Sequence, residues 1–263
     1  MTEAVSPLSP GVARRSGLAV LAFHRVVRRT ERDHDIGWRD FCALLDELDP
    51  SLITVALGAD PSMLKDVQIA LTFDDATEDH VDVARELDRR GMKGVFFVPP
   101  GRLEQRSFMS TSQLRSVDEQ GHVIGAHGLN HVRLPGLSVD EQRREVRDSK
   151  VMLEGLLGHP VDLFAAPGGA YVRDLPEQLA ELGYVAARSM IWGIYASVED
   201  RWHIPCVPVT SFVLQRGWLS TTVETGRMPA AMAWTWRAKE LLPLGFRSFV
   251  RGLVHASKPT RSK

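Results

Sequence analysis

Short apolar runs alternate along this chain with longer segments whose apolar residues recur at helical spacing. The apolar runs are typical of buried strands, and the longer segments predict amphipathic helices. The predicted strands span residues 17–23, 68–73, 94–98, 122–126, 162–166 and 184–189. The predicted helices span residues 38–48, 78–90, 111–121, 138–158 and 176–183. Near-continuous apolar strands between helices indicate an α/β protein whose parallel sheet is covered on both faces.

The number of strand–helix units bears on the topology of this sheet. At least six units follow one another within about 200 residues, which favours a closed barrel over an open sheet. A doubly wound sheet is the alternative, because the pattern alone does not determine strand order. Ser138 and Glu141 have the spacing of a capping box, so we expect the longest helix to begin there.

Three regions of the chain differ in composition. Residues 1–16, rich in Ser, Pro and Gly, predict a flexible leader, and residues 17–215 carry the strand–helix pattern. Residues 216–263 predict a basic helical C-terminal extension, because Trp and Phe recur there at helical spacing with Arg247 and Arg251 between them. This amphipathic tail either packs on the barrel or lies on an anionic membrane surface.

Charge and cysteine content exclude several classes of protein. The chain has 263 residues, with 32 Lys and Arg against 33 Asp and Glu and a formal net charge of −1, so we expect no nucleic-acid partner. Cys42 and Cys206 form no Cys-x-x-Cys motif, which argues against a disulfide framework and against a thiolate zinc site. The sequence shows no signal-peptide pattern and no apolar run of about 18 residues. We therefore expect a cytoplasmic protein, peripheral at the inner membrane face if the tail binds lipid.

Polar side chains gather at the ends of three predicted strands. Asp74 and Asp75 directly follow one of these strands, His127 and His131 follow another, and residues 167–169 follow a third. In an α/β sheet or barrel, the carboxyl ends of parallel strands lie together on one rim, where active sites form. We therefore expect these three groups to converge.

The residue types in these groups predict a metal site. Aspartate alone also favours turns and helix caps, but two adjacent carboxylates at a buried strand end repel each other unless a cation or a shared proton offsets the cost. The histidines are four residues apart, so one helical turn would place both imidazoles on the same side. Two imidazoles and one carboxylate make a catalytic zinc site, and the second carboxylate could act as a general base. Non-haem iron oxygenases use the same ligand set, but they give the second aspartate no role.

Three segments resemble the motifs of one protein family. They are LTFDD (71–75), GAHGLNH (125–131) and FAAPGG (164–169). In order and spacing they are similar to the first three motifs of the NodB-homology polysaccharide deacetylases (carbohydrate esterase family 4). The segments LAFHRV (21–26) and 111–134 are also similar, so the resemblance covers roughly residues 18–210. It implies a distorted (β/α)7 barrel and metal-dependent removal of N-acetyl or O-acetyl groups from sugars.

The resemblance also implies roles for individual residues. Asp74 would be the general base, and Asp75, His127 and His131 would hold the metal. Zinc is the default ion for this ligand set, and cobalt, nickel or manganese could also bind. Gly168 or its neighbour would donate a backbone N–H to the oxyanion of the transition state.

Further residues on the same rim would line the substrate groove. From the third motif these are Pro167 and Gly169. His24 ends the first predicted strand and Trp192 follows the last one, so both would reach the same rim. Each of these two could instead be packed into the core.

Two departures from the family pattern concern the proton transfers. Many members have an arginine that pairs with the base two residues before the proline of the third motif, where this chain has Ala165, so another residue must tune the base. The Leu-x-x-His-like segment that supplies the family's general acid has no match. His203, where we expect a strand to begin, and His255, in the tail, are weak candidates for that role.

Together these features predict a metal-dependent hydrolase that removes acetyl groups, N-acetyl in preference to O-acetyl, from a sugar. Its substrate would be an acetylated amino sugar in a polysaccharide, an oligosaccharide or a glycoconjugate precursor. A membrane-bound tail would bring a lipid-linked sugar within reach. The two departures leave an alternative, a catalytically impaired glycan- or membrane-associated binding module that retains the barrel and the metal site.

Overall fold

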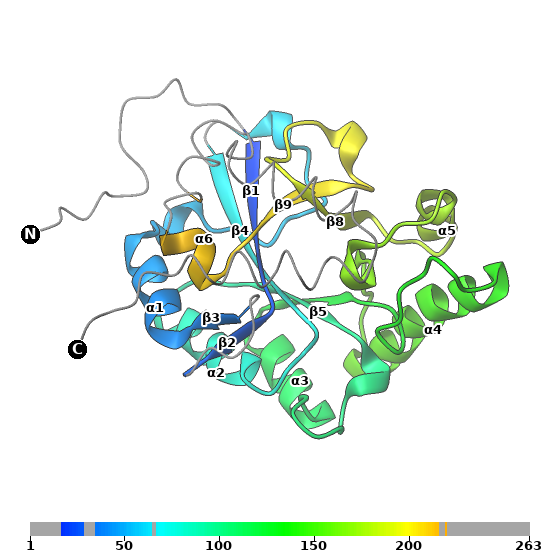
Figure 1. Ribbon diagram of the computed structural model, residues 1–263, viewed down its shortest axis with the longest axis horizontal. Coiled ribbons are helices and arrows are strands. Elements are labelled where there is room, and N and C mark those ends of the chain that lie inside the picture. Colours follow the sequence, from blue (N-terminus) through cyan, green and yellow to red (C-terminus); the bar gives the residue numbers. More distant parts are fainter. Residues whose placement is uncertain (1–16, 29–34, 65–66, 216–218, 220–263) are drawn as a thin grey trace, which may run out of the picture. The chain divides into compact units, whose positions relative to one another are not determined.

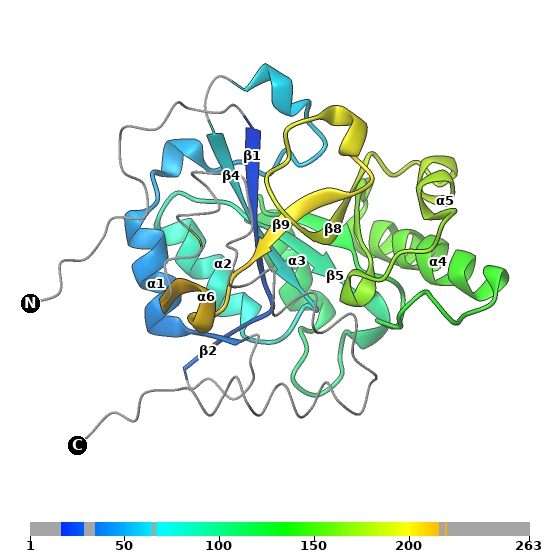
Figure 2. The same ribbon diagram turned by 45° about the horizontal axis from the view of Figure 1, so that its top comes forward.

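Seven parallel strands close into a barrel, as the family resemblance implies (Figure 1). In this computed structural model, residues 17–28, 35–64, 67–215 and 219 are described. β9 pairs with β1 through Val207 and Leu21, so the doubly wound alternative is wrong; Figure 2 shows these two strands side by side. Around the barrel the strands follow in the order β1 (Gly17–Phe23), β4 (Val67–Asp74), β5 (Val95–Val98), β6 (Val123–Ala126), β7 (Leu163–Ala165), β8 (Ala186–Trp192) and β9 (Ile204–Pro208).

Helices connect the strands and cover the outside of the barrel (Figure 1). They are α1 (Trp38–Glu47), α2 (His80–Arg89), α3 (Thr111–Glu119), α4 (Val139–Leu157), α5 (Leu175–Glu181) and the short α6 (Ser211–Gln215). The five helices predicted from the sequence are confirmed, each to within about two residues at its ends. The pattern missed β2 (Arg25–Val27) and β3 (Asp35–Gly37), which pair as a separate small parallel sheet. With three residues each, they are too short to show a period of two.

The inside of the barrel is filled mainly by aliphatic side chains together with Phe97 and Tyr195, and further aromatic rings pack on its outside. Because side chains alternate between the two faces of a strand, β1 points Leu18, Val20 and Ala22 into the interior cluster. On the other face, Phe23 stacks on Phe73 of β4 with 5.1 Å between ring centroids. The two faces of the sheet are thus both buried, which explains the continuous apolar runs in the sequence.

The same alternation brings two charged side chains into the barrel. Ala70 of β4 and Ala186 of β8 belong to the interior cluster. Asp74 follows Ala70 by four residues and Arg188 follows Ala186 by two, so both charged side chains also point inward. Each is only 2% exposed. A carboxylate and a guanidinium are therefore buried together near the carboxyl end of the barrel.

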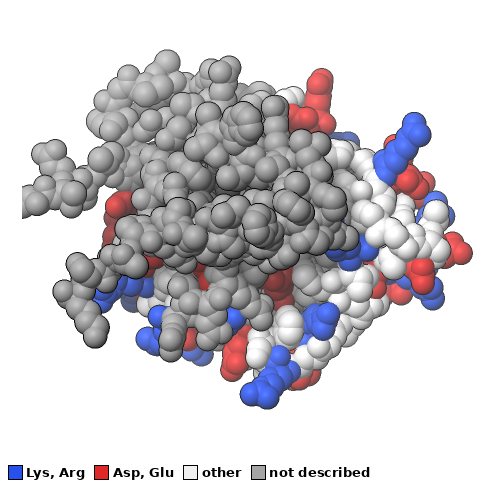
Figure 3. All heavy atoms as spheres, in the orientation of Figure 1, with Lys and Arg blue, Asp and Glu red and all other residues white. Residues whose placement is uncertain are grey.

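The predicted leader (1–16) and all of the predicted tail (216–263) except Leu219 lie outside the described residues. The domain boundaries and the membrane contact therefore stay predictions. Within the described part of the chain, no helix is both long and apolar enough to cross a membrane. On the described surface visible in Figure 3, basic and acidic side chains are interspersed.

The predicted capping box at the start of α4 is confirmed. Ser138 Oγ accepts a hydrogen bond from Glu141 N at 3.4 Å, and Glu141 Oε2 accepts one from Ser138 N at 2.8 Å. These two bonds satisfy backbone N–H groups that have no partner within the helix.

Replacing Ser138 by alanine is expected to lower the free energy of unfolding by about 1 kcal/mol, because the N-terminal backbone of α4 loses its acceptor. Ser116→Ala is the matched control, since Ser116 is an exposed serine inside α3 and alanine is favoured within helices. Urea denaturation of both variants measures the difference. Equal unfolding free energies for the two variants would contradict the prediction.

Candidate active site

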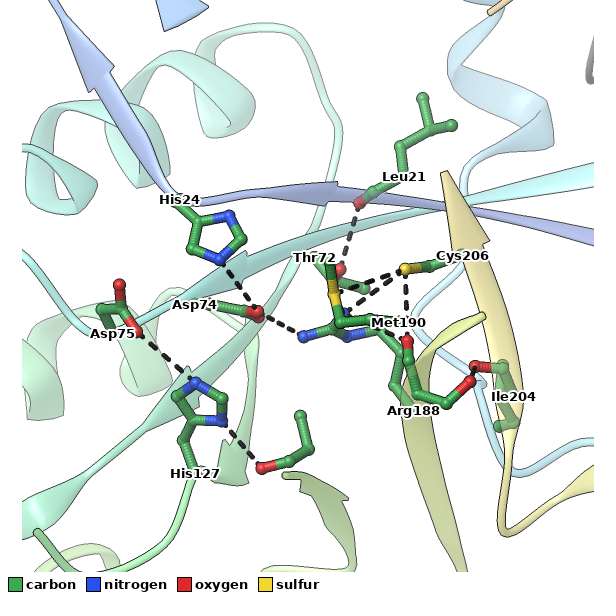
Figure 4. Close-up of polar contacts among 12 residues, drawn as sticks. Leu21, His24, Thr72, Asp74, Asp75, His127, Arg188, Met190, Ile204 and Cys206 are labelled. Atoms are coloured by element: carbon green, nitrogen blue, oxygen red, sulfur yellow. Dashed lines mark hydrogen bonds and ion pairs between the residues drawn. The ribbon is translucent and has the colours of Figure 1, made fainter. Parts of the chain in front are cut away.

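The two aspartates at the end of β4 point in different directions. Asp74 is the last residue of the strand, and the backbone N of Asp75 donates to Phe97 O at 3.1 Å. Asp75 and Ala76 then adopt the left-handed conformation, with φ of 81° and 54°. This sharp turn separates the adjacent carboxylates, so that Asp74 faces the barrel interior and Asp75 faces the histidines (Figure 4).

His127 and His131 both face Asp75, although the loop between them is not the helical turn that their spacing suggested. Gly128 and His131 have φ of 68° and 59°, so the chain folds back through two left-handed residues. The Nε2 atoms of His127 and His131 lie 3.4 and 2.9 Å from Asp75 Oδ1. Left-handed non-glycine residues cost about 1–3 kcal/mol each and persist only where the surroundings hold them. His131 and Asp75 are both such residues.

The ring orientation of His127 fits a metal ligand. Its Nδ1 lies 2.7 Å from Ala165 O, and this carbonyl can only accept, so Nδ1 carries the proton. In the neutral ring, Nε2 therefore presents a lone pair toward the Asp75 carboxylate. Two electron-rich atoms facing each other are stable when a cation lies between them, and such a backbone acceptor is a common partner of ligating histidines.

Asp75, His127 and His131 are the one group of three among the described residues whose ligand atoms lie together, all within 4.8 Å of one another. Burial alone would raise the pKa of the Asp75 carboxyl, but hydrogen bonds from His127 and His131 in their protonated forms, together with the charges of His127 and His24, hold this pKa well below its ordinary value. The carboxyl is therefore an anion at neutral pH. A carboxylate and two imidazoles suit zinc and several other divalent ions.

Asp74 pairs with an arginine that the sequence analysis did not single out. Nη2 of Arg188 donates to Asp74 Oδ2 (Figure 4). The guanidinium also lies 5.2 Å from the Phe97 ring centroid. Burial would raise the pKa of the Asp74 carboxyl, but Arg188 and then His127 offset it, and this pKa is lowered. Asp74 is thus held ionised inside the barrel.

The position of Arg188 explains the missing arginine of the third motif. Arg188 of β8 is paired in register with Ala165 of β7, the position at which many family members have their arginine. The guanidinium therefore reaches Asp74 from β8, the strand next to the one that carries Ala165. One signal was present in the sequence, since Arg188 is the one charged residue of a mainly apolar predicted strand, and a buried arginine needs a carboxylate partner.

The loop of the third motif presents a backbone N–H. Pro167 is buried, whereas Gly168 is exposed and left-handed, with φ of 62°. Gly169 N donates to Ala166 O at 2.9 Å, but within the described residues Gly168 N has no acceptor. A side chain at Gly169 would collide with Met190, because its Cβ would lie 2.5 Å from the Met190 side chain. Gly168 N is therefore the donor that this loop leaves available.

The remaining predicted residues lie in different surroundings. His24 follows β1, and its Nε2 is 3.9 Å from Asp74 Oδ2, with the side chain 26% exposed. Trp192 ends β8 and is half-buried. The ring of His203 lies 4.8 Å from that of Tyr171, at the start of β9, and His255 is outside the described residues. Of the two described histidines considered beyond the metal ligands, His24 is the one that the structure brings to Asp74.

Comparisons with known proteins relate this chain to the polysaccharide deacetylases. Residues 63–187 match the family model described as polysaccharide deacetylase. Over 117 residues, 44% of this chain and 42% of the relative, the chain is 25% identical to YxkH of Bacillus subtilis. Over 145 residues, 53% of this chain and 62% of the relative, it is 28% identical to a peptidoglycan-N-acetylglucosamine deacetylase of Bacillus cereus. The chain thus spans less than two thirds of each of these relatives.

The fold is also found in a solved structure, that of IcaB from Ammonifex degensii. The TM-score is 0.68 at 20% sequence identity, and the match covers 81% of this chain and 99% of that chain. The resemblance stated from the sequence motifs is therefore confirmed in fold.

Replacing Arg188 by methionine is expected to lower the free energy of unfolding by about 3–5 kcal/mol, because Asp74 would be left buried without a counter-charge. Adding Asp74→Asn to the same chain should recover part of this loss, since a neutral amide needs no cation. Urea denaturation of the wild type, both single variants and the double variant gives the coupling energy. Additive losses would show that the two side chains do not stabilise each other.

The loss of stability caused by Arg188→Met is expected to depend on pH. The pKa of Asp74 is lower in the folded protein than its unfolded value of about 3.9. Its contribution to stability is therefore present above that value and is lost as the pH falls through the folded pKa. The difference in the free energy of unfolding between the wild type and Arg188→Met should therefore become smaller as the pH falls below about 4.

Proposed function

We propose that the protein is a metal-dependent hydrolase that removes acetyl groups from a sugar, and the premise of this proposal is the match of residues 63–187 of its barrel to the polysaccharide deacetylases. The observation that carries the proposal is the pair of aspartates divided between two tasks. Asp75 faces two histidines and Asp74 faces an arginine. The Asp75 carboxylate is thus available to bind a cation, and the Asp74 carboxylate is available to accept a proton.

Asp75, His127 and His131 would hold the metal. A divalent ion at these side chains would lower the pKa of a water molecule toward about 7 and polarise the acetyl carbonyl. Zinc is our proposal for the ion, since two imidazoles and one carboxylate with open positions are typical of catalytic zinc sites.

Asp74 is suited to accept the proton of the attacking water. Its Oδ2 is bound by Arg188, whereas its buried Oδ1 has no hydrogen-bond partner among the described residues. The guanidinium fixes the carboxylate and leaves one oxygen free to accept. As water adds to the acetyl carbonyl, its proton passes to Oδ1, and the carbonyl oxygen becomes an anion that Gly168 N–H can stabilise.

His24 is our candidate for the acid that protonates the leaving amine. It is part-exposed, faces Asp74 and comes from a different strand end than the metal ligands. The carbon–nitrogen bond then breaks, the amino sugar takes the proton and acetate leaves. His80 Nε2 contacts the backbone carbonyl of His24, which anchors this residue at the rim.

We propose an N-acetylated amino sugar as the substrate. The relative from Bacillus cereus carries the name of a peptidoglycan-N-acetylglucosamine deacetylase, which supports N-deacetylation over O-deacetylation. The alternative of an impaired binding module is not favoured. A buried ion pair contributes little net stability compared with apolar residues of similar size, so the Asp74–Arg188 pair is better explained by catalysis than by folding.

The metal site predicts a titration result. The metal-stripped wild type is expected to bind about one equivalent of zinc in calorimetry, and His131→Ala should bind it much more weakly, because one of the ligands is lost. His159→Ala is the matched control, since His159 pairs with Asp118 outside the site. Equal zinc binding by the wild type and His131→Ala would refute the site.

The two proton transfers predict different substrate profiles. Asp74→Asn is expected to lower kcat by about 10²–10⁴-fold on both an N-acetylglucosamine oligomer and 4-nitrophenyl acetate, because both need water to be activated. His24→Ala should lower kcat by a similar factor on the amide but much less on the ester, whose leaving group needs no proton. Steady-state kinetics on both substrates measures the contrast. A loss of equal size on both substrates in His24→Ala would contradict its role as the acid.

A further inference from the structure

Glu145, in the middle of α4, lies outside the groups that the reaction uses and yet contacts the loop that carries His127 and His131. Its Oε2 accepts a hydrogen bond from Asn130 N at 2.9 Å, and its Oε1 accepts one from Asn130 Nδ2 at 2.8 Å. One carboxylate thus holds both the backbone and the side chain of the residue that immediately precedes His131.

We propose that Glu145 is a positioning residue that fixes the histidine loop in the conformation that binds the metal, an inference that rests on the proposed function. The loop, residues 127–131, has no regular secondary structure. His131 is left-handed there, with φ of 59°. A ligand in a disfavoured conformation needs outside contacts to hold it, and Asn130 is where those contacts converge.

The peptide planes on both sides of Asn130 are held. The plane between Leu129 and Asn130 is bound twice, because Asn130 N donates to Glu145 and Leu129 O accepts from Gly101 N at 2.8 Å. The plane between Asn130 and His131 is bound at Asn130 O by Arg102 Nε at 3.2 Å. The Arg102 contact is exposed, whereas the Glu145 contacts are part-buried, so Glu145 provides the firmer hold.

The surroundings of Glu145 indicate a specific role. Glu145 is 8% exposed, and within the described part of the chain no Lys or Arg forms an ion pair with it. A buried carboxylate without a cation is costly to desolvate, and hydrogen bonds to the anion must offset that cost. Both of its hydrogen bonds go to Asn130.

The packing at Gly128 leads to the same conclusion. A Cβ at Gly128 would lie 3.1 Å from the Pro167 side chain and 3.4 Å from Glu145 Oε2. The carboxylate therefore approaches the loop backbone at a position where a larger residue would push it away. The loop is enclosed between α4 and the loop of the third motif.

The test compares metal affinity and ligand geometry in Glu145→Gln, which keeps the size of the side chain but replaces one acceptor oxygen by a donor. Zinc affinity is measured by competition with a chromophoric chelator, and the ligand field by the visible spectrum of the Co²⁺-substituted protein. We expect zinc affinity to fall by about 10–100-fold, the loss typical when a partner of a metal ligand is removed, together with altered Co²⁺ bands. Asn130→Ala keeps the backbone bond and should lose less, and it replaces Glu145→Gln if that variant does not fold.

Asp140→Asn is the matched control, because it removes one carboxylate from an exposed position on the same helix. It should bind zinc and Co²⁺ like the wild type. Wild-type affinity and an unchanged Co²⁺ spectrum in Glu145→Gln would overturn the inference and leave the proposed function intact. A wild type that binds neither ion would instead overturn the metal centre of the proposed function, and the inference with it.

Discussion

The ion pair between Asp74 and Arg188 sets the conditions under which the rest of the site can work. Both side chains are buried inside a barrel lined mainly by apolar residues. An isolated carboxylate there would take up a proton, because burial disfavours the charged form. The positive charge of Arg188 keeps Asp74 ionised in spite of its burial. The guanidinium holds one oxygen of Asp74, and the other oxygen is left as an acceptor. The interior that holds the guanidinium also contains small residues such as Ala70 and Ala186, and the guanidinium packs against the Phe97 ring.

A rigid frame is the second requirement, because several site residues have unfavourable backbone conformations. Asp75, His131 and the two glycines of the third motif are all left-handed. Each of them lies just beyond the end of a strand of the closed barrel, whose register with its neighbours is fixed by backbone hydrogen bonds. The strands therefore hold the ends of each loop, and contacts such as that of Glu145 with Asn130 hold its middle.

Those parts of the site that depend on strand order could be predicted from the sequence. Asp75, His127 and Gly168 each follow an apolar run, and parallel strands bring such positions to one rim. The loop at 127–131 was wrongly interpreted as a helical turn, because spacing alone does not show that Gly128 and His131 are left-handed. Glu145 could not be found at all, since its contact with Asn130 depends on how α4 packs against that loop.

Arg188 shows why motif positions and site geometry must be considered separately. In the sequence, Ala165 at the arginine position of the third motif suggests an impaired base. In the barrel, Ala165 and Arg188 are neighbours on paired strands, so a guanidinium attached to either strand can reach the same carboxylate. What the base requires is a cation at Asp74 Oδ2, and the backbone of Ala165 keeps its own role as the acceptor for His127 Nδ1. Moving the arginine to β8 therefore keeps both contacts, and the departure from the motif does not by itself imply a loss of function.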